Sequence, residues 1–171
     1  MQDFVHLHVH TQYSLLDGQA SVSRLVDKAM KDGMKGIAVT DHGNMFGIKE
    51  FTNYVNKKNS GPKGEIKDLK KRIAGIESGE IECEDKEAEI ADCRAKMAEA
   101  ESKLFKPIVG CEMYVARRTM DKKEGKPDQS GYHLIVLAKN EKGYHNLIKL
   151  VSHAWTRGYY MRPRTDRSEL E

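Results

Sequence analysis

Short apolar runs and amphipathic helical patterns alternate along most of the chain. The apolar runs predict four strands, at residues 4–10, 36–40, 107–115 and 132–138. Apolar residues at helical spacing predict one helix after Ser21, a second from Ile48 and a third after Asn140, and both Ser21 and Asn140 suit a helix N-cap. This β–α–β rhythm is typical of an α/β protein with a parallel sheet or barrel.

Residues 63–106 interrupt this rhythm. They carry two stretches of apolar residues at heptad spacing, separated by a turn signal at 77–80. The pattern predicts two antiparallel helices that form a coiled-coil hairpin inserted into the α/β fold, which divides the chain into residues 1–62, 63–106 and 107–171. Such a hairpin is either a partner-docking arm or a surface insertion that the fold tolerates.

Three histidines alternate along the first predicted strand. Because successive side chains of a strand point to opposite faces, His6, His8 and His10 are expected on one face, with the intervening Val and Leu residues on the other. Imidazoles crowded on a half-buried face favour a metal or phosphate site. The alternative is a strand whose histidines are solvated or hydrogen-bonded.

Further metal-ligand side chains lie near the ends of the other predicted strands. His42 follows the second strand, Glu112 lies late in the third, and His133 lies at the start of the fourth, where it fits a parallel arrangement less well. The full set of candidate ligands is His8, His10, Asp17, His42, Glu112 and His133. Mixed nitrogen and oxygen ligands suit Zn²⁺, Mn²⁺ or Fe²⁺, and their number suggests two or three ions, as used in phosphoester hydrolysis. Asp41 is expected to orient a ligand imidazole.

Composition narrows the class of protein. The chain has 171 residues and a formal net charge of +3, which is too small to indicate nucleic-acid binding by itself. The three cysteines and the lack of a leader or membrane span predict a cytoplasmic protein. The final residues resemble the start of a helix, so we expect a piece of a larger protein. A basic stretch that could contact DNA phosphates, or equally form a solvated loop, contains Arg117, Arg118, Lys122 and Lys123.

The motifs themselves resemble a known family. FVHLHVHT at residues 4–11, YSLLDG at 13–18 and VTDHGNM at 39–45 are similar to motifs of the polymerase and histidinol phosphatase (PHP) superfamily. Together with PIVGCEMYV at 107–115 and YHLIVLAKN at 132–140, they resemble the PHP domain at the N-terminus of bacterial DNA polymerase III alpha subunits. The resemblance runs along the whole chain except residues 63–106.

The resemblance implies a distorted (β/α)₇ barrel, incomplete here, with a site for up to three divalent ions. It matches the six candidate ligands position by position and gives His6 a supporting role. The family's later ligands, a Cys and an Asp-x-His pair, are expected beyond residue 171, and Cys83, Cys93 and Cys111 do not match them.

The resemblance also implies a function. The full protein would be a DNA-directed DNA polymerase in replication, and the PHP site would be a metal-dependent phosphoesterase that trims DNA 3′–5′ with a metal-activated water. Implied partners are primer–template DNA and replisome subunits such as a proofreading exonuclease and a sliding clamp, with no membrane partner. One alternative is a stand-alone phosphatase for a small phosphomonoester. Another is a non-catalytic, metal-stabilised docking module for a proofreading exonuclease.

Overall fold

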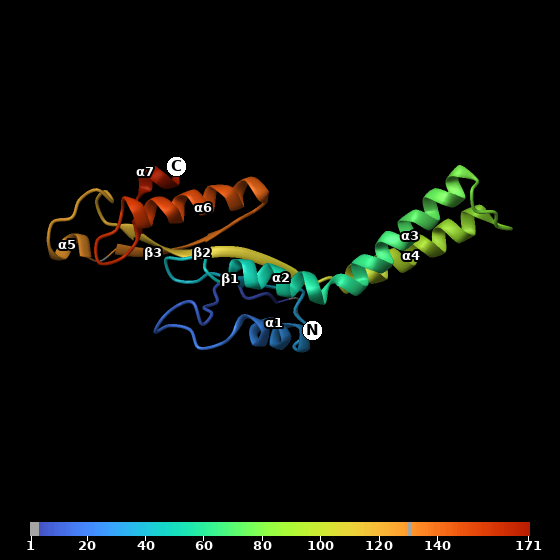
Figure 1. Ribbon diagram of the computed structural model, residues 1–171, viewed down its shortest axis with the longest axis horizontal. Coiled ribbons are helices and arrows are strands. Elements are labelled where there is room, and N and C mark those ends of the chain that lie inside the picture. Colours follow the sequence, from blue (N-terminus) through green and yellow to red (C-terminus); the bar gives the residue numbers. More distant parts are fainter. Residues whose placement is uncertain (1–3, 130) are drawn as a thin grey trace. The chain divides into compact units, whose positions relative to one another are not determined.

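The computed structural model describes residues 4–129 and 131–171 as a mixed α/β protein (Figure 1). Its elements follow the order α1 (Val22–Lys31), β1 (Gly36–Val39), α2 (Ile48–Lys58), α3 (Ser60–Ser78), α4 (Lys86–Ser102), β2 (Lys106–Ala116), α5 (Lys126–Gln129), β3 (Gly131–Leu137), α6 (Glu141–Thr156), β4 (Arg164–Thr165) and α7 (Arg167–Leu170). The chain forms two compact units. One comprises the residues up to Tyr54 together with Pro107–Glu171, and the other comprises Val55–Lys106.

The sheet of the first unit is mixed. Its order is β1-β2-β3, and β4 pairs with β2 in parallel. Strand β3 runs antiparallel to β2, with His133 opposite Tyr114. The expectation of a purely parallel arrangement is therefore wrong for this pair. In the described part of the connection between the two strands, the only helix is the four-residue α5. The Arg118–Asp128 ion pair folds this connection back on itself, so β3 returns beside β2 in the opposite direction.

The predicted strand at residues 4–10 is not a regular strand. Ala38 N donates to His6 O and Thr40 N donates to Val9 O, both at 2.9 Å, so three residues of this segment span two residues of β1. The extra residue produces bends at Leu7 and His8, as in a β-bulge, and breaks the two-residue alternation. Leu7, expected on the covered face, is consequently 49% exposed.

Helices cover both faces of the sheet. Figure 1 shows α6 on one side and α1 on the other. The side chains that join α6 to β2 form a buried cluster of Cys111, Met113, Leu147, Val151 and Ala154. The predicted caps are confirmed, because Ser21 Oγ accepts from Arg24 N and Asn140 Oδ1 accepts from Gly143 N.

The second unit consists mainly of α3 and α4, which pack against each other. Helix α3 begins at Ser60, three residues before the predicted start, and ends at Ser78, where Gly79 caps it in the left-handed conformation. At the base of the pair, Asn59 Nδ2 donates to Phe105 O at 2.8 Å and Phe105 N donates to Asn59 Oδ1 at 2.9 Å. This buried side chain therefore ties together the residues where the helical pair begins and ends.

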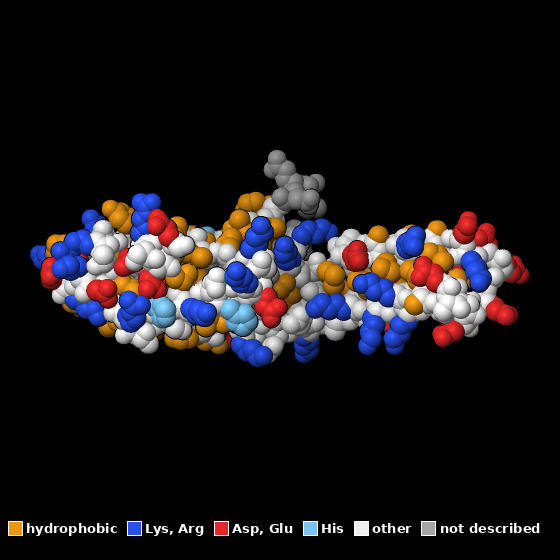
Figure 2. Space-filling model, turned by 90° about the horizontal axis from the view of Figure 1, so that it is seen from above, with side chains coloured by type: hydrophobic (Ala, Val, Ile, Leu, Met, Phe, Trp, Pro, Cys, Tyr) orange, Lys and Arg blue, Asp and Glu red, His pale blue; other side chains and the backbone are white. Residues whose placement is uncertain are grey.

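Charges are segregated along the second unit. In Figure 2, acidic side chains gather at its end, where α3 turns into α4. The surface of α3 is lined by Lys63, Lys67, Lys70 and Lys71. Among the described residues, no helix combines the length and apolar character needed to cross a membrane.

Candidate metal centre

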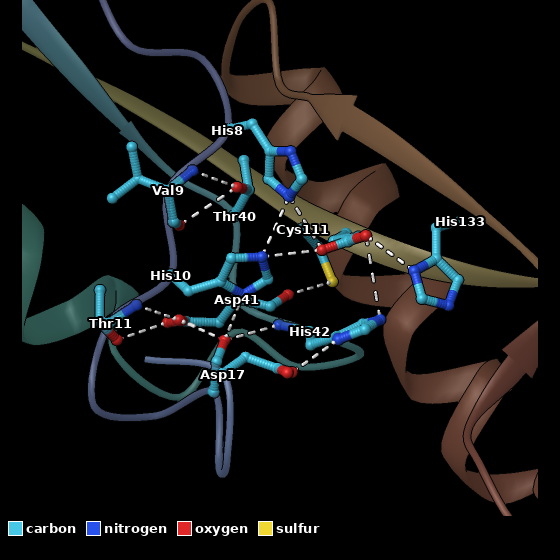
Figure 3. A network of polar contacts seen from close by, with 12 residues as sticks. His8, Val9, His10, Thr11, Asp17, Thr40, Asp41, His42, Cys111 and His133 are labelled. Atoms are coloured by element: carbon cyan, nitrogen blue, oxygen red, sulfur yellow. Dashed lines mark hydrogen bonds and ion pairs between the residues drawn. The ribbon is translucent and has the colours of Figure 1, made fainter. Parts of the chain in front are cut away.

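The imidazoles of His8, His10, His42 and His133 gather around one point (Figure 3). The Glu112 carboxylate lies at the centre of this cluster. Its Oε2 atom is 2.9 Å from both His8 Nε2 and His10 Nε2, and those two nitrogens are 3.0 Å apart. Its Oε1 atom is 2.9 Å from His133 Nδ1 and 4.0 Å from His42 Nε2. Each oxygen of this one carboxylate thus faces a separate pair of histidines, which is the arrangement of a carboxylate that bridges two ions.

The antiparallel course of β3 explains how His133 reaches the cluster. Glu112 lies on β2 opposite Ile135, and His133 lies two residues earlier on β3, opposite Tyr114. Because the strands run in opposite directions, the start of β3 lies beside the carboxyl end of β2. The position of His133 at the start of its strand, which fits a parallel sheet poorly, brings it to the site in this sheet.

The surroundings of Glu112 keep it ionised. Burial raises the pKa of Glu112, but the hydrogen bond with His8 and the neighbouring imidazoles of His42 and His10 outweigh burial, so its pKa lies below its ordinary value. A buried carboxylate held in its charged form between imidazoles is well suited to bind a cation.

His42 presents a nitrogen that the surrounding protein leaves unused. Its Nδ1 lies 2.9 Å from Asp17 Oδ2, a contact that holds the pKa of Asp17 below its usual range. Its Nε2 is buried and has no hydrogen-bond partner among the described residues. Because Asp17 accepts a proton from Nδ1, the lone pair stays on Nε2, which faces Glu112 and His133. A buried imidazole nitrogen that accepts no hydrogen bond needs another partner, and a metal ion would supply one.

Ser14 sets the orientation of His10. The Ser14 hydroxyl donates to Asp41 Oδ1 at 2.8 Å and accepts from His42 N at 2.9 Å. Its single proton is therefore committed to Asp41, so His10 Nδ1, at 2.8 Å, must donate to Ser14. This tautomer leaves the lone pair of His10 on Nε2, which is the atom that faces Glu112.

Asp41 acts on the imidazoles only through this network. Its buried carboxylate also accepts from Thr11 N at 2.7 Å and from Thr11 Oγ1 at 2.8 Å. It makes no direct hydrogen bond to an imidazole in the described parts of the chain. Sequence reasoning identified Asp41 but missed Ser14 and Thr11, because an isolated hydroxyl residue in a loop carries no periodic signal.

Cys111 lies beside the cluster but is chemically separate from it. Burial raises the pKa of its thiol to about 12, and its Sγ atom donates to Asp41 O at 3.3 Å. A thiol that remains protonated and engaged with a carbonyl is a poor metal ligand. Cys111 therefore belongs to the support of the site.

Other predicted residues do not join the ligand atoms around Glu112 in the part of the chain that the structure describes. His6 packs against Phe4, with ring centroids 4.7 Å apart, and joins neither group of ligand atoms that could hold an ion. Asp17 contacts the far nitrogen of His42 and lies outside these two groups. In the basic stretch, Arg118 pairs with Asp128 and Glu124, Lys122 lies 3.7 Å from Glu124, and the Arg117 guanidinium sits over the Tyr132 ring.

Comparison with known proteins agrees with the geometry. The sequence matches the PHP domain family over residues 6–171. The chain belongs to the PHP domain family. Over 98% of its length this PHP domain is 40% identical to a DNA polymerase III subunit alpha of Borreliella burgdorferi, and over 95% it is 39% identical to one of Treponema pallidum. A third relative with the same name, from Aquifex aeolicus, is 33% identical over 99% of the chain.

The PHP domain spans only about a tenth of the length of these relatives, covering 11%, 10% and 11% of them. Within the domain, the atoms of His8, His10 and Glu112 form one group that could hold an ion, and those of His42, Glu112 and His133 form another. In each group the ligand atoms lie within 4.8 Å of one another. Around an ion bound at about 2.1 Å, neighbouring ligand atoms are about 3–3.5 Å apart, so these residues fit a divalent metal.

Proposed function

We propose that this PHP domain is a metal-dependent phosphoesterase that trims the 3′ end of a DNA strand. The observation that supports this most strongly is Glu112, whose two oxygens each face a pair of histidines. The ligands proposed for Zn²⁺, Mn²⁺ or Fe²⁺, with up to three ions in the complete site, are His8, His10, Asp17, His42, Glu112 and His133. His6 and Asp41 would support them.

The chemistry of such a site is divided between ions and protein. The ions would supply Lewis acidity and activate a water for attack on phosphorus. Glu112 would help to hold the ions, because it belongs to both groups of ligand atoms. Asp17 and Ser14 would keep His42 and His10 in the tautomers that present Nε2, and a histidine that donates its other proton is a more basic ligand.

We further propose that the chain is the N-terminal part of a DNA polymerase III alpha subunit. The relatives named above support this, because they match nearly the whole chain. The full protein would then extend a primer in the bacterial cytoplasm and would work with primer–template DNA, a sliding clamp and a proofreading exonuclease. Arg117, Arg118, Lys122 and Lys123 would be the basic residues that contact DNA phosphates. Arg117 and Lys123 would contribute most, since Arg118 and Lys122 already lie beside acidic side chains.

In this proposal residues 1–62 and 107–171 belong to one distorted barrel, and residues 63–106 are a coiled-coil insertion. Two features support the insertion. Ile76, Cys93 and Ala100 are buried within the helical pair, and Asn59 binds the backbone of Phe105 at its base.

Metal analysis and a ligand variant test the phosphoesterase proposal. The full-length protein should co-purify with Mn²⁺, Zn²⁺ or Fe²⁺ or bind it on titration, and it should shorten single-stranded DNA from the 3′ end. His10→Ala should reduce this trimming by about 100-fold or more, because loss of an outer partner of a metal ligand alone costs about 10–100-fold. His145→Ala, which changes an exposed histidine on α6, should have no effect.

The same experiment separates the alternatives. A protein that binds metal but trims no DNA, with His10→Ala lowering only its stability, would be the docking module. Hydrolysis of small phosphomonoesters without trimming of DNA would indicate a phosphatase. A full-length protein that binds none of the three metals contradicts the proposed site.

A further inference from the structure

A row of exposed aromatic rings lies directly beside the histidine cluster. Trp155 and Tyr159 stack with centroids 5.7 Å apart, and Phe46 lies 6.5 Å from Trp155. The three side chains are 44%, 48% and 68% exposed. Trp155 Nε1 donates to Gly43 O at 2.8 Å, one residue from His42, so the row is fixed to the segment that carries a candidate ligand. Large apolar rings that are held in place yet remain exposed mark a binding surface.

The aromatic row lines a hollow of about 660 Å³ that also includes His42 and Asp17. This volume lies within the range of about 300–1,000 Å³ typical of small-molecule sites. Two further residues of its wall, Leu16 and Met161, have positive φ angles of 75° and 61° and are 105% and 66% exposed. The left-handed conformation is costly for bulky side chains, and such strained residues concentrate at functional sites.

The wall of the hollow also carries a positive charge, the guanidinium of Arg162. The Arg162 guanidinium lies 4.9 Å from the centre of the Tyr114 ring and donates to Tyr114 Oη at 2.7 Å. The Tyr114 ring in turn stacks on His42, with centroids 4.2 Å apart and planes 14° apart. Tyr114 therefore places a positive charge next to the histidine cluster, on the wall of the same hollow as the aromatic row.

We propose that this hollow binds the terminal nucleotides of a single-stranded DNA end, with bases stacked on Phe46, Trp155 and Tyr159 and a backbone phosphate on Arg162. The inference rests on the proposed phosphoesterase function and names the surface that presents its substrate. Stacking surfaces combined with cations are the usual means of holding single strands without regard to sequence. A base-paired end would bind less well, because its bases are already stacked on each other.

Photochemical crosslinking tests the contact independently of catalysis. A single-stranded oligonucleotide with 5-iodouracil at its 3′-terminal nucleotides is irradiated with the full-length protein in EDTA, which prevents cleavage. Mass spectrometry should locate the adduct on Phe46, Trp155 or Tyr159. If no adduct forms on these residues, for instance because chain beyond residue 171 covers them, the inference is wrong.

Kinetics of aromatic variants provide the second test. Trp155→Ala and Phe46→Ala should each raise KM for trimming of single-stranded DNA by about 10-fold, the effect expected from loss of one base–aromatic contact. Hydrolysis of bis(p-nitrophenyl) phosphate, which offers no DNA base, should fall much less than trimming, so the ratio of the two activities should drop by about 10-fold. Phe46→Ala is the cleaner variant, because the Phe46 side chain is 68% exposed and the substitution leaves the backbone N that donates to Asn44 Oδ1 in place.

Two controls complete the design. Tyr144→Ala removes an aromatic ring from the same helix, away from the hollow, and should change nothing. Trp155→Phe should retain most of the DNA affinity. Equal losses on DNA and on the small diester would assign the row a purely structural role and overturn the inference. If the wild-type protein hydrolyses neither substrate, the phosphoesterase proposal fails, while the crosslink still decides the contact.

Discussion

At the scale of single residues, the hydrogen-bond partners of each imidazole determine which of its nitrogens can bind a metal ion, and residue type alone does not. The candidate ligands could be proposed from the sequence because histidine, aspartate and glutamate are common metal ligands. Ser14 could not, because its role depends on Asp41 and His42, which lie nearly thirty residues away in sequence. Only the fold shows that its one proton is already committed.

Ser14→Ala tests whether the Ser14 hydroxyl fixes the tautomer of His10. The variant removes the acceptor that holds the proton on His10 Nδ1, so the imidazole is free to rotate or change tautomer. We expect about a 10-fold loss of affinity for Mn²⁺ or Zn²⁺ in titrations of the full-length protein, in line with other partners of metal-bound histidines. Ser152→Ala, which changes an exposed serine on α6, is the matched control. Equal affinity in both variants would show that Ser14 does not position His10.

The protected state of Cys111 gives a second residue-scale prediction. A pKa raised to about 12 by burial leaves only about one thiol in 10⁴ ionised at pH 8, so native Cys111 should resist iodoacetamide. Cys83, on the partly exposed turn between α3 and α4, should be alkylated first. Mass spectrometry of the native protein after brief alkylation checks the order. Modification of Cys111 before Cys83 would contradict this account of its environment.

At the scale of elements, periodicity predicted the helices well and the strands unevenly. Helices α1 and α6 begin where Ser21 and Asn140 cap them, since capping is a local interaction. The alternation at residues 4–10 was misleading because a single extra residue opposite β1 breaks it, and hydropathy does not reveal register. The direction of β3 was equally hidden, because both directions have the same alternation.

Helix α7 and the loop after β2 are joined by Asp166. This buried carboxylate caps α7 through Glu169 N at 3.2 Å and accepts from Met120 N at 2.8 Å and Ser168 Oγ at 2.7 Å. Burial raises its pKa, but these donors outweigh burial and hold the pKa below its ordinary value. The carboxylate therefore stabilises the fold fully above about pH 4, and this stabilisation is lost as pH falls through the lowered native pKa.

Asp166→Asn tests this pH dependence. The amide offers one acceptor oxygen in place of two, so at pH 7 one hydrogen bond worth about 1 kcal/mol should be lost. Hydrogen exchange of the Met120 amide should then be about 5-fold faster than in the wild type, and this difference should shrink as pH falls below 4. Asp121→Asn, which alters an exposed aspartate of the same loop, is the control. A difference that is constant with pH would contradict the assignment.

At the scale of the whole molecule, the chain combines a site-bearing α/β unit with a helical unit of a different character. The helical unit could be predicted from its heptad spacing, because its apolar residues pack against each other within the pair. Ile76 and Ala100 are fully buried there. What periodicity could not show is Asn59, whose amide binds the backbone of Phe105 and so brings the two ends of the unit together.

Removal of the helical pair tests whether it is an appendage. Because Asn59 and Phe105 are already hydrogen-bonded neighbours, Ser60–Leu104 can be replaced by two glycines without a long new loop. The full-length variant should remain folded and keep its metal content, since every candidate ligand lies in the other unit. Soluble yield, resistance to limited proteolysis and bound metal measure the outcome.

Two results decide how this deletion is interpreted. Adding Asn59→Ala to the deletion variant should lower its yield, because the amide that aligns the joined ends is lost. A deletion variant that aggregates even with Asn59 intact would show that the helical pair is part of the core. A folded variant that trims DNA normally but no longer binds another replisome subunit would identify the pair as a docking arm, whereas unchanged binding would favour a tolerated insertion.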